Sequence, residues 1–195
     1  SRQNIQFHWV KKPGVLDIVK TLAENNMKSI NGCGDNTRNV MACPMGHHSD
    51  IFDATKWSQK IADYFQLPLA PFMEIFAIDP KYMRQPEESF AYGPNLLNRK
   101  FKIGFSSLYR DEKTGKIIAD NCTEMLTNDL GVAPIAENGK VTKFQIYVGG
   151  GQGERNGKPG LATLAQPLCI VSEAQLLKTM DAVVKVHQEW GDRQN

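Results

Sequence analysis

Three basic residues stand close together in the stretch RKFK, from Arg99 to Lys102. The run KFKIGFS alternates in polarity and predicts a strand with Phe101 and Ile103 on one face. Lys100 and Lys102 would share the other face, about 7 Å apart at a rise of ~3.3 Å per residue. Neighbouring cations repel each other unless water or an anion screens them. The stretch therefore predicts either a solvated strand face or a binding site for an anion.

A further basic residue, Arg38, lies in the loop GCGDNTRNV. Its planar guanidinium suits carboxylates and oxyanions. Gly32 and Gly34 allow positive φ values and a close approach of the backbone to a ligand. The loop is thus a second candidate for anion binding, and a solvated surface arginine is the alternative.

Three consecutive glycines occur in VGGGQG, from Val148 to Gly153. Such a run costs backbone entropy, so it indicates either a sharp bend or backbone N–H groups that surround an anion. It is not a dinucleotide fingerprint, because the preceding elements are predicted to form a hairpin rather than a βαβ unit. It also lacks the Lys-Ser/Thr ending of a phosphate loop.

The composition is that of an ordinary globular protein. The chain has 195 residues, 41% hydrophobic and 23% charged, which suffices for one domain or slightly more. A net charge of +2 argues against a general nucleic-acid binder, so anion binding must come from local placement of charge. No apolar run approaches the ~20 residues of a membrane span, and no signal peptide pattern is present. We therefore expect a cytoplasmic protein with no membrane or nucleic-acid partner.

The chain has four cysteines without a Cys-x-x-Cys pair: Cys33, Cys43, Cys122 and Cys169. This argues against a disulfide framework or a self-contained zinc centre. Cys33 and Cys43 could be combined with His47 and His48, but the spacing fits no standard ligand pattern. The sequence alone therefore predicts no metal ligands.

Periodicity predicts the elements of the first half of the chain. Ile5, Phe7 and Trp9 alternate with other residues and predict a strand. A turn at Pro13-Gly14 precedes a predicted helix over residues 15–26, and residues 31–44 are expected to form a loop. Asp53 is a candidate cap for a helix over residues 54–65.

The second half is predicted to be richer in strands. We expect a strand at 73–78, a long connection over 79–98, the strand of RKFK, and a turn at Thr114-Gly115. Asn138-Gly139 lies between two alternating runs and strongly predicts a hairpin over 132–148. Ser172 and Gln175 form a capping box for a last helix that ends at Gly191. This order favours an α+β fold, with an antiparallel sheet and helices on one face.

Taken together, these segments resemble the haemoproteins of assimilatory sulfite reductase, within the sirohaem and 4Fe-4S nitrite and sulfite reductase family. Six segments carry the resemblance, in family order along the whole chain: SRQNIQFH, GDNTRNVMACP, NRKFK, TNDLGV, FQIYVGGGQG and VHQEWGDR.

The resemblance implies roles for individual residues. Arg38, Lys100 and Lys102 resemble the groups that hold the substrate oxyanion over the haem iron. Other positions resemble those that line the cofactor or contact its carboxylates: Arg2, Gln6, His8, Arg99, Asn128, Gly149, Gly150, Gly151, Gln152 and Gly153.

The resemblance also implies an activity, the six-electron reduction of sulfite to sulfide in sulfur assimilation. Sirohaem and a 4Fe-4S cluster would carry the electrons, and ferredoxin or an NADPH-linked flavoprotein would supply them. Cationic side chains would offset the repulsion between an anionic substrate and an anionic macrocycle, and lysines could deliver protons. The Phe101-Lys102 pair favours sulfite over nitrite.

The chain departs from the family pattern because it lacks the Cys-x5-Cys and Cys-x3-Cys set that holds the cluster. It therefore resembles a middle portion of the enzyme. Residues 1–31 would end a ferredoxin-like half-domain, and residues 32–195 would form the first sirohaem-binding domain. Alone it is expected to be inactive. The alternatives are a nitrite reductase of the same family, a non-catalytic tetrapyrrole or anion-binding module, and a plain structural domain.

Overall fold

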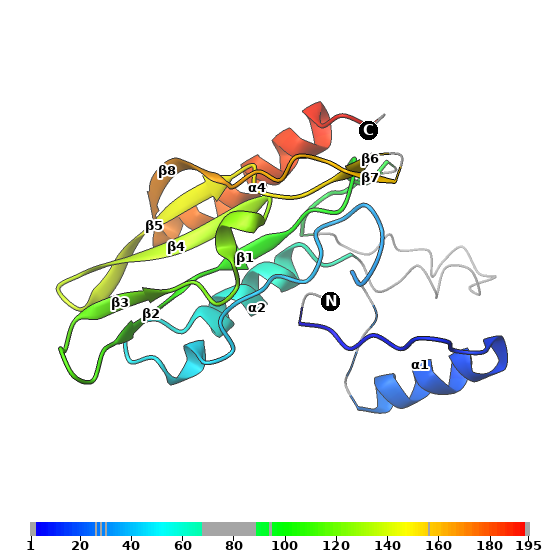
Figure 1. The fold of residues 1–195 in the computed structure, drawn as a ribbon, viewed down its shortest axis with the longest axis horizontal. Coiled ribbons are helices and arrows are strands. Elements are labelled where there is room, and N and C mark those ends of the chain that lie inside the picture. Colours follow the sequence, from blue (N-terminus) through cyan, green and yellow to red (C-terminus); the bar gives the residue numbers. More distant parts are fainter. Residues whose placement is uncertain are drawn as a thin grey trace, which may run out of the picture.

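A four-stranded sheet with two long helices behind it dominates the computed structural model (Figure 1). The structure describes residues 3–25, 27, 29, 31–67, 89–93, 95–155 and 157–193. Its helices are α1 (Val15–Glu24), α2 (Ala54–Tyr64) and α4 (Glu173–Trp190), with short 3-10 turns η1 (Lys12–Gly14), η2 (Gly46–His48) and η4 (Met125–Thr127). Its strands are β1 (Ile103–Phe105), β2 (Ser107–Arg110), β3 (Ile117–Asp120), β4 (Leu130–Glu137), β5 (Lys140–Val148), β6 (Glu154–Arg155), β7 (Lys158–Pro159) and β8 (Gln166–Ser172).

The main sheet has the strand order β1-β4-β5-β8. The β4–β5 and β5–β8 pairs are antiparallel, whereas β1 and β4 are parallel. The β2–β3 hairpin and η4 lie between β1 and β4 in the chain, and this connection returns the chain to the same end of the sheet. The predicted α+β class is confirmed, and among the strands that the structure describes the parallel β1–β4 pair departs from an antiparallel main sheet.

Helices α2 and α4 cover the same face of the sheet (Figure 1). Trp57 of α2 packs on Phe144 of β5, with ring centroids 5.6 Å apart. The Tyr64 hydroxyl donates a hydrogen bond of 2.7 Å to Asp181 of α4. The core includes the fully buried side chains of Ile61, Phe65, Phe90, Phe105, Phe144, Ile146, Leu176, Met180 and Val184.

Local signals in the sequence determine where these helices begin. Asp53 is the N-cap of α2 and accepts hydrogen bonds from the backbone N–H groups of Thr55 at 3.1 Å and Lys56 at 3.3 Å. At the start of α4, the backbone N–H of Ser172 donates to the Gln175 side chain at 3.2 Å, as a capping box requires. Both predicted caps are confirmed.

The two predicted turns are also present. Asn138 and Gly139 have φ values of 53° and 79°, the left-handed pair that matches the twist of the β4–β5 hairpin. Gly115 has a φ of 66° in the turn between β2 and β3.

The strand predicted for RKFK begins later than expected, because β1 starts only at Ile103, Arg99 lies in a bend, and residues 100–102 lie outside any strand. Phe101 forms a parallel bridge with Thr37, and Gly104 forms one with Met41. The loop around Arg38 therefore runs beside β1, on the edge opposite β4.

The predicted strand at Ile5, Phe7 and Trp9 is wrong, because residues 4–8 have no regular secondary structure. Trp9 is 98% exposed, and Ile5 and Phe7 are more than half exposed. The segment is attached to the body through side chains instead: Gln3 Nε2 donates to the Ala42 carbonyl at 2.7 Å, and Asn4 Nδ2 donates to Asn39 Oδ1 at 3.2 Å. Alternation alone predicts a strand, but a strand also needs a neighbouring backbone to pair with.

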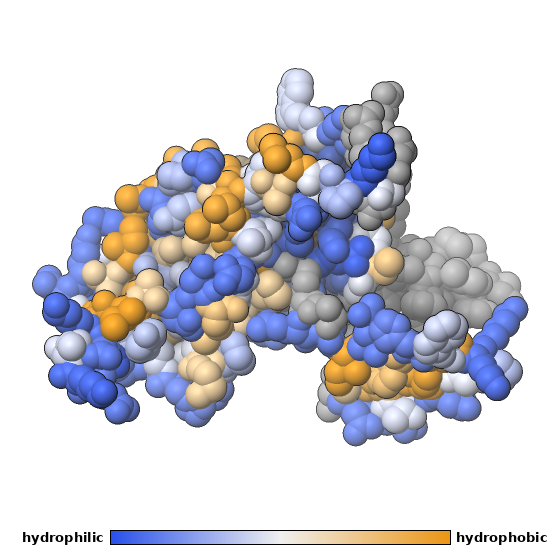
Figure 2. Space-filling view, viewed as in Figure 1, coloured by the Kyte–Doolittle hydropathy of each residue, from blue (hydrophilic) through white to orange (hydrophobic). Residues whose placement is uncertain are grey.

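Helix α1 is confirmed, but it lies apart from the main sheet and carries exposed apolar side chains, which Figure 2 shows as an orange patch. The predicted strand at 73–78 and residues 79–88 of the predicted connection lie outside the described residues. Within the part of the chain that the structure describes, none of the helices combines the length and the apolar character that crossing a membrane requires.

The glycine run after β5 packs tightly against the segment that carries η4. Gly149 N–H donates to the Asp129 carbonyl at 3.0 Å, and Gly151 exchanges two backbone hydrogen bonds of 2.9 Å with Thr163. A Cβ atom on Gly150 would lie closer than 3.0 Å to the carbonyl oxygens of both Leu126 and Asn128. The close approach of two backbones therefore explains the glycine at position 150.

The substitution Gly150→Ala should lower the free energy of unfolding by about 1–3 kcal/mol, because the backbone must shift to admit the methyl group. Urea denaturation monitored by circular dichroism measures this. Gly153→Ala is the matched control, since nothing lies within 4 Å of the added Cβ there. Equal stability of the two variants would contradict the packing argument.

His187 of α4 is a half-buried titratable group whose Nε2 atom is buried without a hydrogen-bond partner among the described residues. Its ring lies 4.9 Å from that of Phe101. Burial lowers the pKa of His187 below its ordinary 6.5, and the positive charges of Arg99 and Arg193 lower it further, whereas Asp129 raises it. The folded protein therefore favours the neutral imidazole.

The free energy of unfolding should fall as the pH drops below 6.5, because the unfolded chain then binds a proton that the folded chain resists. Above that pH the contribution of His187 is fully present. Unfolding measured between about pH 5 and 7.5 should show a smaller pH dependence for His187→Gln than for the original chain. The same slope in both proteins would rule out His187 as the source.

Candidate functional site

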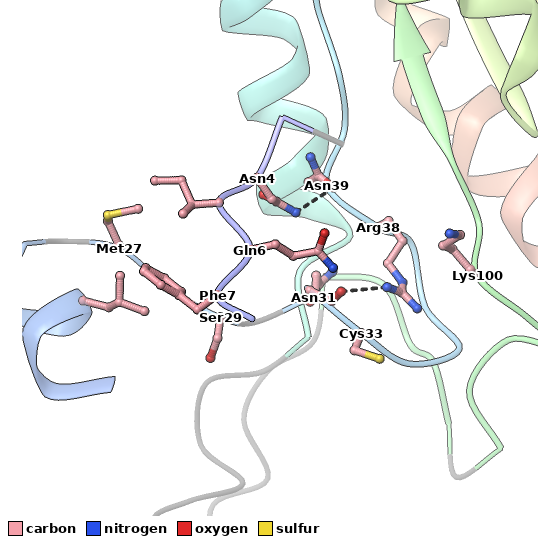
Figure 3. Close-up of a pocket in the computed structure, with 13 residues that line it drawn as sticks. Asn4, Gln6, Phe7, Met27, Ser29, Asn31, Cys33, Arg38, Asn39 and Lys100 are labelled. Atoms are coloured by element: carbon pink, nitrogen blue, oxygen red, sulfur yellow. Dashed lines mark hydrogen bonds between the residues drawn. The ribbon is translucent and has the colours of Figure 1, made fainter. Parts of the chain in front are cut away.

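A cavity of about 740 Å³ lies between the N-terminal segment with α1 and the loop that carries Arg38. Arg38 and Lys100 lie on one side of it, and Phe7 and Met27 lie on the opposite side (Figure 3). Its remaining lining residues are mostly small and polar, with two further apolar side chains: Asn4, Ile5, Gln6, Leu22, Ser29, Asn31, Gly32, Cys33 and Asn39. We call this space the first cavity. It pairs a cationic side with an apolar side.

The guanidinium of Arg38 is held by its own loop. Nη1 donates to the Gly32 carbonyl at 2.7 Å, and Nε and Nη2 donate to the Gly34 carbonyl at 3.2 and 3.0 Å. An arginine has five N–H donors, so these bonds leave two for a ligand. The loop glycines of the sequence thus position the arginine through their carbonyl groups.

The loop itself is fixed to the core by buried hydrogen bonds. The Tyr92 hydroxyl lies 2.6 Å from Thr37 Oγ1 and donates to the Phe65 carbonyl at 2.7 Å. Asn31 Nδ2 donates to the carbonyls of Thr37 and Phe65 at 2.9 and 3.1 Å. Arg38 therefore projects from a backbone that α2 and the segment around Tyr92 hold in place.

A second, smaller cavity of about 370 Å³ lies beside the glycine run. It is lined by Lys102, Thr127, Gly151, Gln152, Ala162, Thr163 and Leu164. We call it the second cavity. Because Lys100 lines the first cavity and Lys102 lines the second, the structure divides the cations of RKFK between two sites.

Arg99, the first residue of RKFK, forms an ion pair with Asp129. Arg99 Nη2 lies 2.6 Å from Asp129 Oδ1, and the backbone N–H of Lys102 donates to Asp129 Oδ2 at 2.7 Å. The carboxylate is buried, with 4% of the side chain exposed, whereas Arg99 is half exposed. One buried carboxylate thus fixes both ends of the Arg99–Lys102 segment.

Three of the ten predicted cofactor positions line a cavity: Gln6 lines the first, and Gly151 and Gln152 line the second. His8 is exposed and lines neither cavity, and Arg2 lies outside the described residues.

The other predicted positions mainly support structure. Asn128 is fully buried, and its Nδ2 donates to the Glu124 and Met125 carbonyls at 3.2 Å each. Arg99 pairs with Asp129, and Gly149 and Gly150 pack on the segment 126–129. Gly153 accepts a 2.6 Å hydrogen bond from the Gly160 N–H.

Sequence reasoning missed two residues that position the site. Asp129 belongs to the TNDLGV segment, one of the segments that carry the family resemblance, and this was the signal that could have drawn attention to it. Thr163 lines the second cavity, and its hydroxyl donates to the Gly149 carbonyl at 3.0 Å. No pattern in the sequence distinguishes Thr163 from other threonines.

Two cysteines and a carboxylate form a separate group. The ligand atoms of Cys43, Asp120 and Cys122 lie within 4.8 Å of one another. Burial, together with Cys43 and Asp120 nearby, raises the pKa of the Cys122 thiol to about 12. Cys33 and Cys169 lie outside this group.

Comparisons with known proteins show what this chain is similar to. A family model described as the nitrite and sulphite reductase 4Fe-4S domain matches residues 33–195. The sulfite reductase (NADPH) hemoprotein beta-component of Acidithiobacillus ferrooxidans is 32% identical over 197 residues, which cover 100% of this chain and 33% of that protein. The protein of the same name from Shewanella sediminis is 29% identical over 199 residues, again covering 100% and 33%.

The solved structure of the NirA protein of Mycobacterium tuberculosis has a TM-score of 0.61 and 21% identity, and the match covers 100% of this chain and 29% of that chain. At this identity the likeness concerns the fold alone. The chain spans about a third of the length of the curated relatives. Since the family model covers most of the sequence, the chain belongs to the nitrite and sulfite reductase family.

Proposed function

We propose that this chain is part of a sirohaem-dependent sulfite reductase, which reduces sulfite to sulfide in sulfur assimilation. The observation that carries the proposal is the first cavity, in which Arg38 and Lys100 face an apolar side formed by Phe7 and Met27. Sirohaem combines an apolar ring with carboxylate groups at its edge, so it needs both kinds of surface.

The first cavity fits part of such a group. Its volume of about 740 Å³ falls within the ~300–1,000 Å³ common for ligand pockets. Arg38 keeps two N–H donors available after its loop hydrogen bonds, and Lys100 adds an exposed ammonium group. Gln6 and Asn39 add polar groups on the lining. When bound, sirohaem would supply the redox centre.

The chain's own contribution would be electrostatic. Arg38 and Lys100 would hold carboxylates or a substrate oxyanion, offsetting the repulsion between like charges. Lys102 at the second cavity would act beside the glycine run, and Asp129 would position it through its backbone N–H. A lysine ammonium can also donate a proton, which the reduction of sulfite consumes.

The described cysteines do not fit a 4Fe-4S cluster. Such a cluster takes four cysteine thiolates, and among the described residues only Cys43 and Cys122 lie close together. The proposal therefore assigns the cluster's ligands to polypeptide outside this chain. Residues 32–195 would form the first sirohaem-binding domain, and residues 1–31 the end of a ferredoxin-like half-domain. The electron donor would be ferredoxin or an NADPH-linked flavoprotein, the latter in keeping with the relatives' names.

Nitrite is the second candidate substrate. Phe101 is buried, with 2% of its surface exposed, so of the Phe101-Lys102 pair Lys102 is the residue that lines a described cavity. We favour sulfite because the Phe101-Lys102 pair resembles the sulfite reductases of the family, whereas its nitrite reductases tend to have Asn at the position of Lys102. A non-catalytic tetrapyrrole or anion-binding module remains the alternative for the chain by itself.

Titration of the purified chain with sirohaem should give a saturable shift of the visible spectrum. The double substitution Arg38→Gln and Lys100→Gln should weaken binding at least tenfold. Hydrogen bonds to charged groups contribute ~1.5–3 kcal/mol each, and ~1.4 kcal/mol is a factor of ten in affinity.

The matched control is the double substitution Lys113→Gln and Lys116→Gln in the turn between β2 and β3, which removes the same charge away from both cavities. Its affinity should equal that of the original chain. Equal losses in both double variants would indicate a general effect of charge, and the absence of any saturable shift would remove the support for cofactor binding.

A further inference from the structure

We propose that Cys43, Asp120 and Cys122 form a binding site for a single zinc-like divalent cation. Their two sulfur atoms and one carboxylate oxygen all lie within 4.8 Å of one another. The site is separate from the first and second cavities and from the 4Fe-4S cluster of the proposed function. The proposal depends neither on the cavities nor on the proposed function.

The separations between the three ligand atoms are close to those around a bound zinc ion. Zinc binds sulfur at about 2.3 Å and carboxylate oxygen at about 2.0–2.2 Å, so tetrahedral ligand atoms lie about 3.5–3.8 Å apart. The present separations exceed these by at most about 1.3 Å, a difference that small side-chain rotations can close. Three protein ligands leave the fourth position for water, which is typical of an open zinc site.

The ligands come from two segments that β1 holds together. The backbone N–H of Phe105 donates to the Met41 carbonyl at 2.8 Å, two residues before Cys43. The carbonyl of the same Phe105 accepts a 3.0 Å hydrogen bond from Thr123 Oγ1, one residue after Cys122. A single residue of the sheet therefore positions both cysteines.

The turn that carries the other two ligands is itself well ordered by hydrogen bonds. The Cys122 N–H donates to Asp120 Oδ1 at 3.0 Å, which leaves Oδ2 for a cation. The Met125 N–H donates to Asn121 Oδ1 at 2.9 Å, and the Glu124 N–H donates to the Asn121 carbonyl at 2.9 Å. A site assembled in advance lowers the ordering cost of binding.

The donor set determines the class of cation. Thiolates select zinc and other soft or borderline ions over magnesium and calcium, which prefer oxygen ligands. Two thiolates and a carboxylate would outweigh the charge of a divalent ion by one unit, as in known sites with several cysteines. Cys43 is buried and Cys122 is exposed, so the ion has both a protected ligand and an entry path.

The test is titration of the reduced chain with Zn²⁺ alone, followed by calorimetry, with Co²⁺ as a spectroscopic probe of thiolate ligation. We expect about one ion per chain and a thiolate-to-cobalt absorption band. Each of three substitutions should weaken binding at least tenfold: Cys43→Ser, Cys122→Ser and Asp120→Asn. Substituting residues that only hydrogen-bond to metal ligands often causes a loss of this size, so substituting a ligand itself should cause at least as much. Asp120→Asn keeps an acceptor for the Cys122 N–H, so it tests the ligand rather than the turn.

Cys33→Ser and Cys169→Ser are the matched controls, because they remove the other two cysteines. Both should bind Zn²⁺ as the original chain does, and circular dichroism of the metal-free variants checks their folding. Equal weakening in the controls, or full affinity in the three site variants, would overturn the proposal. So would a chain that binds no Zn²⁺ under reducing conditions and instead loses two hydrogens by mass on mild oxidation, which would identify a disulfide pair.

Discussion

The backbone of Phe101–Phe105 is the constraint on which the rest of the structure depends. On one edge it pairs with the Arg38 loop: Arg38 N–H donates to the Phe101 carbonyl at 2.8 Å, and Met41 N–H donates to the Ile103 carbonyl at 3.0 Å. On the other edge it pairs with β4. A strand with both edges occupied cannot slide without breaking both ladders. The loop with Arg38, the segment with the lysines and the turn with Cys122 are therefore fixed relative to one another.

This constraint also governs the electrostatics. Arg99, Lys100 and Lys102 are brought together on one short segment, and Asp129 offsets that concentration of positive charge from the start of the next strand in the sheet. The remaining cations then point into two separate cavities, Lys100 beside Arg38 and Lys102 beside the glycine run. The arrangement suits a ligand, or a cofactor and its substrate, with anionic groups at more than one point.

Local chemistry made much of the fold predictable. Asp53 and Ser172 begin their helices, and Asn138-Gly139 closes its hairpin, because each of these effects acts within a few residues. The strand expected at Ile5 to Trp9 fails because pairing depends on a distant backbone that no local pattern reveals. The parallel pairing of β1 with β4 is non-local in the same sense.

Whether a feature of the candidate site could be predicted likewise depends on how local its contacts are in the sequence. Arg38, Lys100 and Gln6 line one cavity, whereas Asn128 is buried and supports the neighbouring backbone. The pairing of Arg99 with Asp129 joins residues 30 positions apart, and the group of Cys43 with Asp120 and Cys122 spans a longer interval still. Spacing rules for metal ligands and paired residues assume that the residues are close together along the chain. They therefore identify neither the ion pair nor the cysteine group.

Native-state hydrogen exchange of individual amides tests the central role of the Phe101–Phe105 backbone most directly. The amides of Arg38, Met41, Phe101 and Phe105 should exchange as one group, with an opening free energy equal to that of β4 and β5. If the amides of Arg38 and Met41 instead exchanged through a low-energy local opening while β4 and β5 stayed protected, the loop would not be fixed by β1. The account of how the basic residues are positioned would then be contradicted.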